Sequence, residues 1–184
     1  MVNSTRFRMI KNRRRSSVTD YKRRIALLKS RLNRVVVRKS NRSIRMQIVE
    51  YTEKGDRILA SAGSGELAAM QWQPRANIPT AYLTGMLLAK KAKGMATQEM
   101  VLDTGLYKPI KSSVVFAAAK GAIDGGLKIA NNIEFDEKRL SGQHISEYAK
   151  AAGKDKFSGY RKANFDAQRM KEIFEELKKK IASA

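Results

Sequence analysis

The chain has 184 residues, with 38 lysines and arginines against 17 acidic residues, which gives a formal net charge of +21. It contains no cysteine and one histidine, His144, so disulfide frameworks and metal sites built on cysteines or paired histidines are excluded. No run of about 18 apolar residues is present, and the basic beginning lacks the apolar stretch of a secretory signal. We therefore expect a cytoplasmic protein with one domain of ordinary size and tails, or at most two small domains, whose charge is matched by a polyanion.

Most of the excess charge lies in the first quarter of the chain. Residues 1–45 hold sixteen basic residues and a single acid, for a net +15, whereas residues 46–184 have a net +6. Cations at this density are costly to desolvate, so we expect a disordered arm attached to a folded body. The planar fork of donors on arginine fits phosphate, which favours a nucleic-acid partner. A solvated flexible tail and a localisation signal are the alternative interpretations.

The next segment reads as a helix that Thr19 or Asp20 can cap. Helical spacing places four apolar side chains on one face: Tyr21, Ile25, Leu28 and Leu32. This face would pack on the body while the basic side chains face phosphates. A plain amphipathic surface helix is the alternative, and Tyr21 suits either stacking on RNA or packing beside Ile25.

Three strands are predicted after this helix, over residues 35–39, 43–51 and 57–62. Turns at 40–42 and 53–56 separate them, so they form an antiparallel meander. The meander is decorated by basic residues, which makes one rim or face of the sheet basic. Ser40 and Asn41 suit both a turn and contact with phosphate.

Further along, a long helix begins at the cap Asn77 and is closed by Gly94. A short strand at 100–102 precedes a helix that Ser112 or Ser113 caps and that ends near Asp124. The order β-β-β-α-β-α predicts an α/β fold, in which the three-stranded antiparallel meander extends into a mixed sheet with packed helices.

The expected divisions are a basic arm with an RNA-facing helix, an α/β body, and a C-terminal extension; they span residues 1–33, 34–130 and 131–184. In the extension, residues 153–159 read as a linker and 162–182 as a helix that docks on a partner or on the body. Trp72 lies in a loop, where packing and base stacking are both open.

Several short stretches together resemble a known family, the universal large-subunit ribosomal protein eighteen that binds 5S ribosomal RNA, in its archaeal and eukaryotic form. The matching stretches are Arg13-Arg14-Arg15 with Thr19-Asp20-Tyr21; Val36-Val37-Arg38-Lys39-Ser40-Asn41; Gln47–Tyr51 with Gly55-Asp56; Ala81–Gly85; Val101-Leu102-Asp103 with Gly105-Leu106; Phe116–Ala118 with Lys120–Ala122 and Asp124; and Gly142 with His144-Ile145. They occur in family order over roughly residues 6–148. The family's long archaeal-type extension occupies the remainder.

The resemblance implies a structural constituent of the large subunit that helps anchor 5S ribosomal RNA in the central protuberance. Its partners would be 5S and large-subunit ribosomal RNA and neighbouring proteins, including a second 5S-binding protein, with no membrane, small-molecule substrate, metal or cofactor. The candidate RNA-binding residues, from the basic patches and the resemblance together, are Arg6, Arg8, Lys11, Arg13, Arg14, Arg15, Tyr21, Lys22, Arg23, Arg24, Arg31, Arg38, Lys39, Ser40, Asn41, Arg42 and Arg45.

Three other functions compete with this one. A metal-dependent nuclease would need Asp56, Asp103 and Asp124 to converge, although each suits a turn or cap. A membrane-surface protein is disfavoured because the arm has few apolar residues and the last helix carries acids. A generic RNA-binding or chaperone protein outside the ribosome is the main alternative, although aromatic residues are few for a stacking platform. We do not expect an enzyme.

Overall fold

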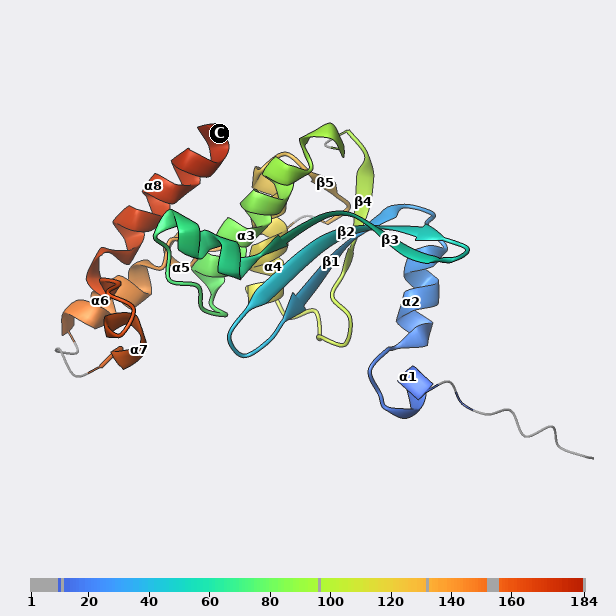
Figure 1. Cartoon of the computed structure of the whole chain (residues 1–184), viewed down its shortest axis with the longest axis horizontal. Coiled ribbons are helices and arrows are strands. Elements are labelled where there is room, and N and C mark those ends of the chain that lie inside the picture. The colour runs from blue at the N-terminus through green and yellow to red at the C-terminus, as the bar shows by residue number, and fades with distance from the viewer. Residues whose placement is uncertain (1–9, 11, 96, 132, 152–155, 184) are drawn as a thin grey trace, which may run out of the picture.

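Figure 1 shows the computed structural model of the chain, which describes residues 10, 12–95, 97–131, 133–151 and 156–183. At its centre is a five-stranded sheet with the order β3-β2-β1-β4-β5. The strands are β1 (Asn33–Lys39), β2 (Ile44–Thr52), β3 (Gly55–Gly63), β4 (Glu99–Asp103) and β5 (Lys128–Ile129). The first three form the predicted antiparallel meander, while β4 pairs parallel with β1 and β5 pairs parallel with β4. The predicted α/β class with a mixed sheet is therefore confirmed.

Two helices, α3 (Ile78–Lys91) and α4 (Val114–Asp124), pack together against one face of this sheet (Figure 1). Their backbones touch where Gly85 faces α4 and Gly121 faces α3. A Cβ atom added at Gly85 would stand 2.1 Å from the Ala118 carbonyl oxygen, and one at Gly121 would stand 2.0 Å from the Tyr82 carbonyl oxygen. Only glycine fits at these two positions, so the backbones of the two helices come into direct contact.

The core explains the β-branched run of β1. Val35 and Val37 are fully buried on the side of α3 and α4, where Leu83 and Met100 also lie. Successive side chains of a strand point to opposite faces, so Val36 lies on the other face of the sheet. It is only 9% exposed, which means that β1 is covered on both faces.

The long helix α3 starts as predicted but ends earlier. The Asn77 side chain accepts a hydrogen bond from the Thr80 amide at 3.1 Å, which caps the helix. The α-helix ends at Lys91 rather than Lys93, because the Ala92 amide bonds to both the Leu88 and Ala89 carbonyls and the chain tightens into a short 3-10 turn. The sequence pattern does not distinguish this turn from a further α-helical turn.

The arm helices α1 (Asn12–Arg15) and α2 (Tyr21–Leu28) lie at the end of the molecule opposite to the C-terminus (Figure 1). The predicted cap holds, because the Asp20 side chain accepts hydrogen bonds from the amides of Lys22 and Arg23. The extension of the helix to Leu32 is wrong, since α2 stops at Leu28 and Arg31, with φ +57°, turns the chain into β1. The expected apolar packing is also wrong: no residue of α2 is buried, and Ile25 is 55% exposed.

The C-terminal extension is a cluster of short helices that ends in one longer helix. The elements are the 3-10 helix Ala167–Arg169 and the α-helices α5 (Glu137–Leu140), α6 (Gln143–Ala151), α7 (Ser158–Arg161) and α8 (Met170–Ser183). The predicted helix over 162–182 is wrong in its first part. Asn164, with φ +51°, breaks it, and Asp166 caps the turn that leads into α8. Residues 153–155 of the expected linker lie outside the described residues.

Helix α8 docks on the body through its apolar face. Phe174 is 2% exposed, and its ring centroid lies 5.5 Å from that of Tyr82 on α3. Trp72, 1% exposed, packs against Phe165 and donates its indole N–H to the Thr80 hydroxyl at 2.9 Å. Trp72 is thus a core residue and does not stack on RNA. None of the helices in the described part is long and apolar enough to span a bilayer.

Candidate nucleic-acid interface

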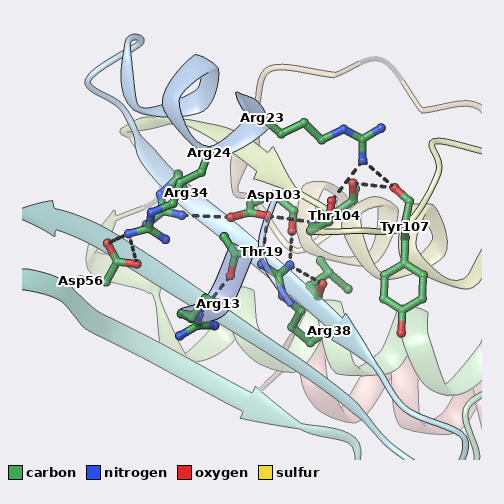
Figure 2. Close-up of polar contacts among 12 residues, drawn as sticks. Arg13, Thr19, Arg23, Arg24, Arg34, Arg38, Asp56, Asp103, Thr104 and Tyr107 are labelled. Atoms are coloured by element: carbon green, nitrogen blue, oxygen red, sulfur yellow. Dashed lines mark hydrogen bonds and ion pairs between the residues drawn. The ribbon is translucent and has the colours of Figure 1, made fainter. Parts of the chain in front are cut away.

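Helix α2 faces the side of the sheet that α3 and α4 leave open, and ion pairs bridge the two (Figure 2). The Arg24 guanidinium on α2 lies 2.9 Å from both carboxylate oxygens of Asp56 on β3. The same carboxylate lies 2.9 Å from Nη2 of Arg34 on β1. Asp56 was expected in a turn, but it belongs to a strand, because β3 begins at Gly55. This carboxylate therefore joins three elements.

A second carboxylate continues the pattern towards β4. Arg34 is only 2% exposed and contacts Asp103 Oδ2 through Nη1 at 2.9 Å. The other oxygen of Asp103 accepts hydrogen bonds from Arg38 Nη2 at 3.0 Å and from the Gly105 amide at 2.8 Å. We call this alternating chain of charges the Arg–Asp network; its members are Arg24, Asp56, Arg34, Asp103 and Arg38. It neutralises both acids and leaves one net positive charge.

The network lowers the pKa of Asp56. Partial burial opposes ionisation of this carboxyl group, but the hydrogen bonds and positive charges of Arg34 and Arg24 outweigh it and hold the pKa below its ordinary value of 3.8. Asp56 is therefore ionised at neutral pH. Its charge is used to hold arginines, so it does not add a free negative charge to the surface.

Other contacts fix the arm and the segment after β4. The Arg23 guanidinium on α2 donates to the carbonyl oxygens of Gly105 and Tyr107, each at 3.1 Å. The Arg13 side chain donates to the Thr19 hydroxyl at 3.0 Å, which fixes the connection between α1 and α2. Figure 2 shows both contacts beside the Arg–Asp network.

Between α2 and the open sheet face lies a groove of about 1090 Å³. Its floor is apolar, with Val36, Val49 and Leu102 each less than 10% exposed. Arginines from the arm and from β1 line it as well: Arg13, Arg23, Arg24, Arg34 and Arg38. The exposed arginines around this groove suit a polyanion such as RNA, while the buried apolar residues close its base.

The candidate RNA-binding residues fall into two groups. Arg13, Arg23, Arg24 and Arg38 are positioned by contacts within the protein, and the Ser40 hydroxyl accepts the Ser43 amide in the β1–β2 turn. A second group has side chains that make no hydrogen bond or ion pair with any described residue: Arg15, Lys22, Arg31, Lys39, Asn41, Arg42 and Arg45. Tyr21 is half-buried and makes contacts within the chain. Arg6, Arg8 and Lys11 lie outside the described residues, as does the side chain of Arg14.

The three acids considered for a nuclease do not converge. Asp56 and Asp103 are each bound to two arginines. Asp124, on α4, accepts the Tyr82 hydroxyl at 2.9 Å and pairs with Lys120 at 3.0 Å. Across the part of the chain that the structure describes, no three His, Cys, Asp or Glu residues are placed to hold a metal ion. Asp56 and Asp103 instead hold the arginines of this surface in place.

The sequence interpretation missed Arg34 as an organiser of this surface, and it weighed Asp56 and Asp103 as metal ligands or as turn and cap residues, not as partners of arginines. The available signal was an arginine directly before the valine run of a predicted strand, because a cation that becomes buried there requires a carboxylate partner. The sequence could not identify that partner, since Asp103 is 69 residues away.

Fold and surface together define a basic α/β protein of the nucleic-acid-binding class. Residues 5–99 match the family model described as ribosomal large subunit proteins 60S L5 and 50S L18. The chain is 42% identical over 184 aligned residues to large ribosomal subunit protein uL18 of Haloarcula marismortui, covering 98% of this chain and 96% of the relative. It is 40% identical to the uL18 proteins of Thermofilum pendens and Methanococcus maripaludis, again over nearly the full length of each.

The chain therefore belongs to this family of ribosomal large-subunit proteins. Membership makes it a structural component of the cytoplasmic ribosome, in an archaeal-type form, and not an enzyme. The resemblance drawn from the short sequence stretches is confirmed at the level of the family.

Proposed function

We propose that the chain binds 5S ribosomal RNA and helps to anchor it in the central protuberance of the large subunit. The observation that supports this proposal is the groove beneath α2, where arginines held by Asp56 and Asp103 stand over an apolar floor. Large-subunit ribosomal RNA and a second 5S-binding protein are included as neighbours. The arm residues Arg6, Arg8, Lys11 and Arg13–Arg15 are proposed to contact phosphates.

The mechanism combines charge neutralisation with selection of shape. Each phosphate contacted by a lysine or arginine releases counterions, so about ten contacts give a log–log salt slope of roughly −7 to −9. This term does not depend on sequence or fold of the RNA. Selectivity comes from shape, 2′-hydroxyl groups and bases splayed from loops, which fixed arginines can address because their geometry is set before binding.

The test is competitive binding of the full chain to an archaeal 5S ribosomal RNA and to transfer RNA, at about 0.2 M salt, where non-specific contacts are weak. We expect a preference of about a hundredfold or more for 5S RNA. Equal affinity for the two RNAs would contradict the proposal and favour a generic RNA-binding or chaperone role.

A further inference from the structure

The segment that joins β4 to α4, residues 104–111, has an unusual surface; we call it the β4–α4 loop. Its six consecutive residues from Leu106 to Lys111 are all exposed. Leu106 is 56% exposed, Tyr107 38% and Ile110 63%. Large apolar side chains gathered in one exposed loop are a feature of binding surfaces rather than of solvated connections.

Contacts with two other elements hold the β4–α4 loop in place. Arg23 on α2 donates to the Gly105 and Tyr107 carbonyl oxygens, and the Tyr107 hydroxyl donates to the Lys39 carbonyl at the end of β1. Gly105, with φ +63°, lies against Arg38, since a Cβ atom there would stand 2.9 Å from the guanidinium carbon. The loop is thus a fixed bridge between α2 and the end of β1. Figure 2 shows the contacts that Arg23 makes on the α2 side.

The charge of the loop is uniformly positive. Lys108 and Lys111 are exposed, and neither makes a hydrogen bond or ion pair with a described residue. No acid occurs from residue 104 to residue 123, and the preceding Asp103 is occupied by two arginines. No acidic residue of the loop therefore competes with an anionic partner for these two lysines.

We propose that the β4–α4 loop is a further RNA-contacting element, in which Lys108 and Lys111 bind phosphates and Tyr107 and Ile110 contact an exposed base or sugar. This inference rests on the proposed function, because it extends the same surface. The inference is supported by the position of the loop next to the candidate interface, because the loop is hydrogen-bonded to Arg23 and Lys39, both candidate RNA-binding residues. The uniform positive charge favours RNA over an apolar protein partner.

The experiment measures the affinity of the full chain for an archaeal 5S ribosomal RNA as a function of salt, for the parent and for the double variant Lys108→Ala/Lys111→Ala. Two lost phosphate contacts reduce the magnitude of the salt slope by about 2 and the affinity at 0.2 M salt by about tenfold. The variant Lys108→Arg/Lys111→Arg keeps both charges and restores the parental slope.

The matched control is Lys179→Ala/Lys180→Ala, which removes two exposed lysines from α8 and leaves the slope within measurement error of the parent. Circular dichroism checks that all variants are folded. Where the parent selects 5S RNA, two results overturn the inference. One is a salt slope of the loop variant equal to that of the parent, and the other is an equal loss of slope in the α8 control. A parent that does not select 5S RNA instead overturns the proposed function. A loop variant with full RNA affinity that fails only to bind another ribosomal protein overturns the RNA assignment.

Discussion

Helix α2 and helix α8 lie at opposite ends of the molecule (Figure 1), and each joins the body through a different kind of contact. Helix α8 buries Met170, Phe174, Leu177 and Ile181 and packs on α3. Helix α2 buries no residue and is joined to the sheet through Arg24 and Asp56. Apolar contacts exclude water and fix α8 as part of the fold. Ion pairs keep α2 near the sheet and leave polar groups and a groove accessible.

The two attachments predict different sensitivities, and the largest effect is expected at α8. Phe174→Ala removes a ring that is 2% exposed and packed against Tyr82 and Trp72. We expect a loss of about 3–5 kcal/mol in the free energy of unfolding. Urea denaturation followed by circular dichroism measures it, with the exposed Ile25→Ala on α2 as a control that costs well under about 1 kcal/mol. Similar losses of unfolding free energy for the two variants would show that α2 and α8 are attached to the body in the same way.

The arm is expected to contribute binding and little stability. Reversing the charge of Arg13, Arg14 and Arg15 to glutamate removes three proposed phosphate contacts and adds repulsion. Affinity for 5S ribosomal RNA at about 0.2 M salt falls by about a hundredfold or more, and its salt dependence flattens. Filter binding over a salt series measures both quantities. An affinity equal to the parent's would remove the arm from the interface.

An intermediate effect on RNA affinity is expected when Asp56 is replaced. Whether the affinity rises or falls shows whether Asp56 acts through its negative charge or by positioning arginines. If the acid acted only through its charge, Asp56→Asn would strengthen RNA binding by removing a negative group. Because Asp56 positions Arg24 and Arg34, we expect the affinity to fall about three- to fivefold, in the range of one weakened charged hydrogen bond.

The control is Glu53→Gln, an exposed acid of the β2–β3 turn whose side chain has no partner among the described residues. It is expected to leave affinity unchanged or to raise it slightly. In an Arg24→Ala background, Asp56→Asn should cost less than in the parent, since part of its action passes through Arg24. Tighter binding by Asp56→Asn would refute the positioning role.

The smallest effect is a pH dependence of the contribution of Asp56 at the α2 end. The pKa of Asp56 is lowered in the folded protein, so its ion pairs stabilise the fold above the ordinary value of 3.8, and this stabilisation is lost as the pH falls through the lower folded value. The difference in unfolding free energy between the parent and Asp56→Asn should therefore shrink from about pH 5 downwards. The deficit of Phe174→Ala should stay constant over the same range. A constant deficit for Asp56→Asn would contradict the assigned ion pairs.

The same comparison shows what could be predicted from the sequence. The three strands, the caps Asp20 and Asn77 and the two central helices follow from local patterns, and the structure has them. The packing of α2 does not follow, because its apolar spacing suggested a buried face where arginines make the contacts. The interface depends on pairs far apart in sequence, such as Arg34 with Asp103, and no local pattern encodes them. The late start of α8 depends on Asn164, whose positive φ ends the preceding turn together with the local bond from the Phe165 amide to the Tyr160 carbonyl, and the helical spacing of the apolar residues did not reveal this break.

The crossing of α3 and α4 at Gly85 and Gly121 has a consequence for hydrogen exchange. With the backbones in contact there, no solvent layer can enter between the helices without separating them along their length. The amides of residues 82–89 and 118–122 should exchange only when the whole body unfolds, and should report its global stability. The amides of α2 should exchange much earlier, through local opening that leaves this crossing intact.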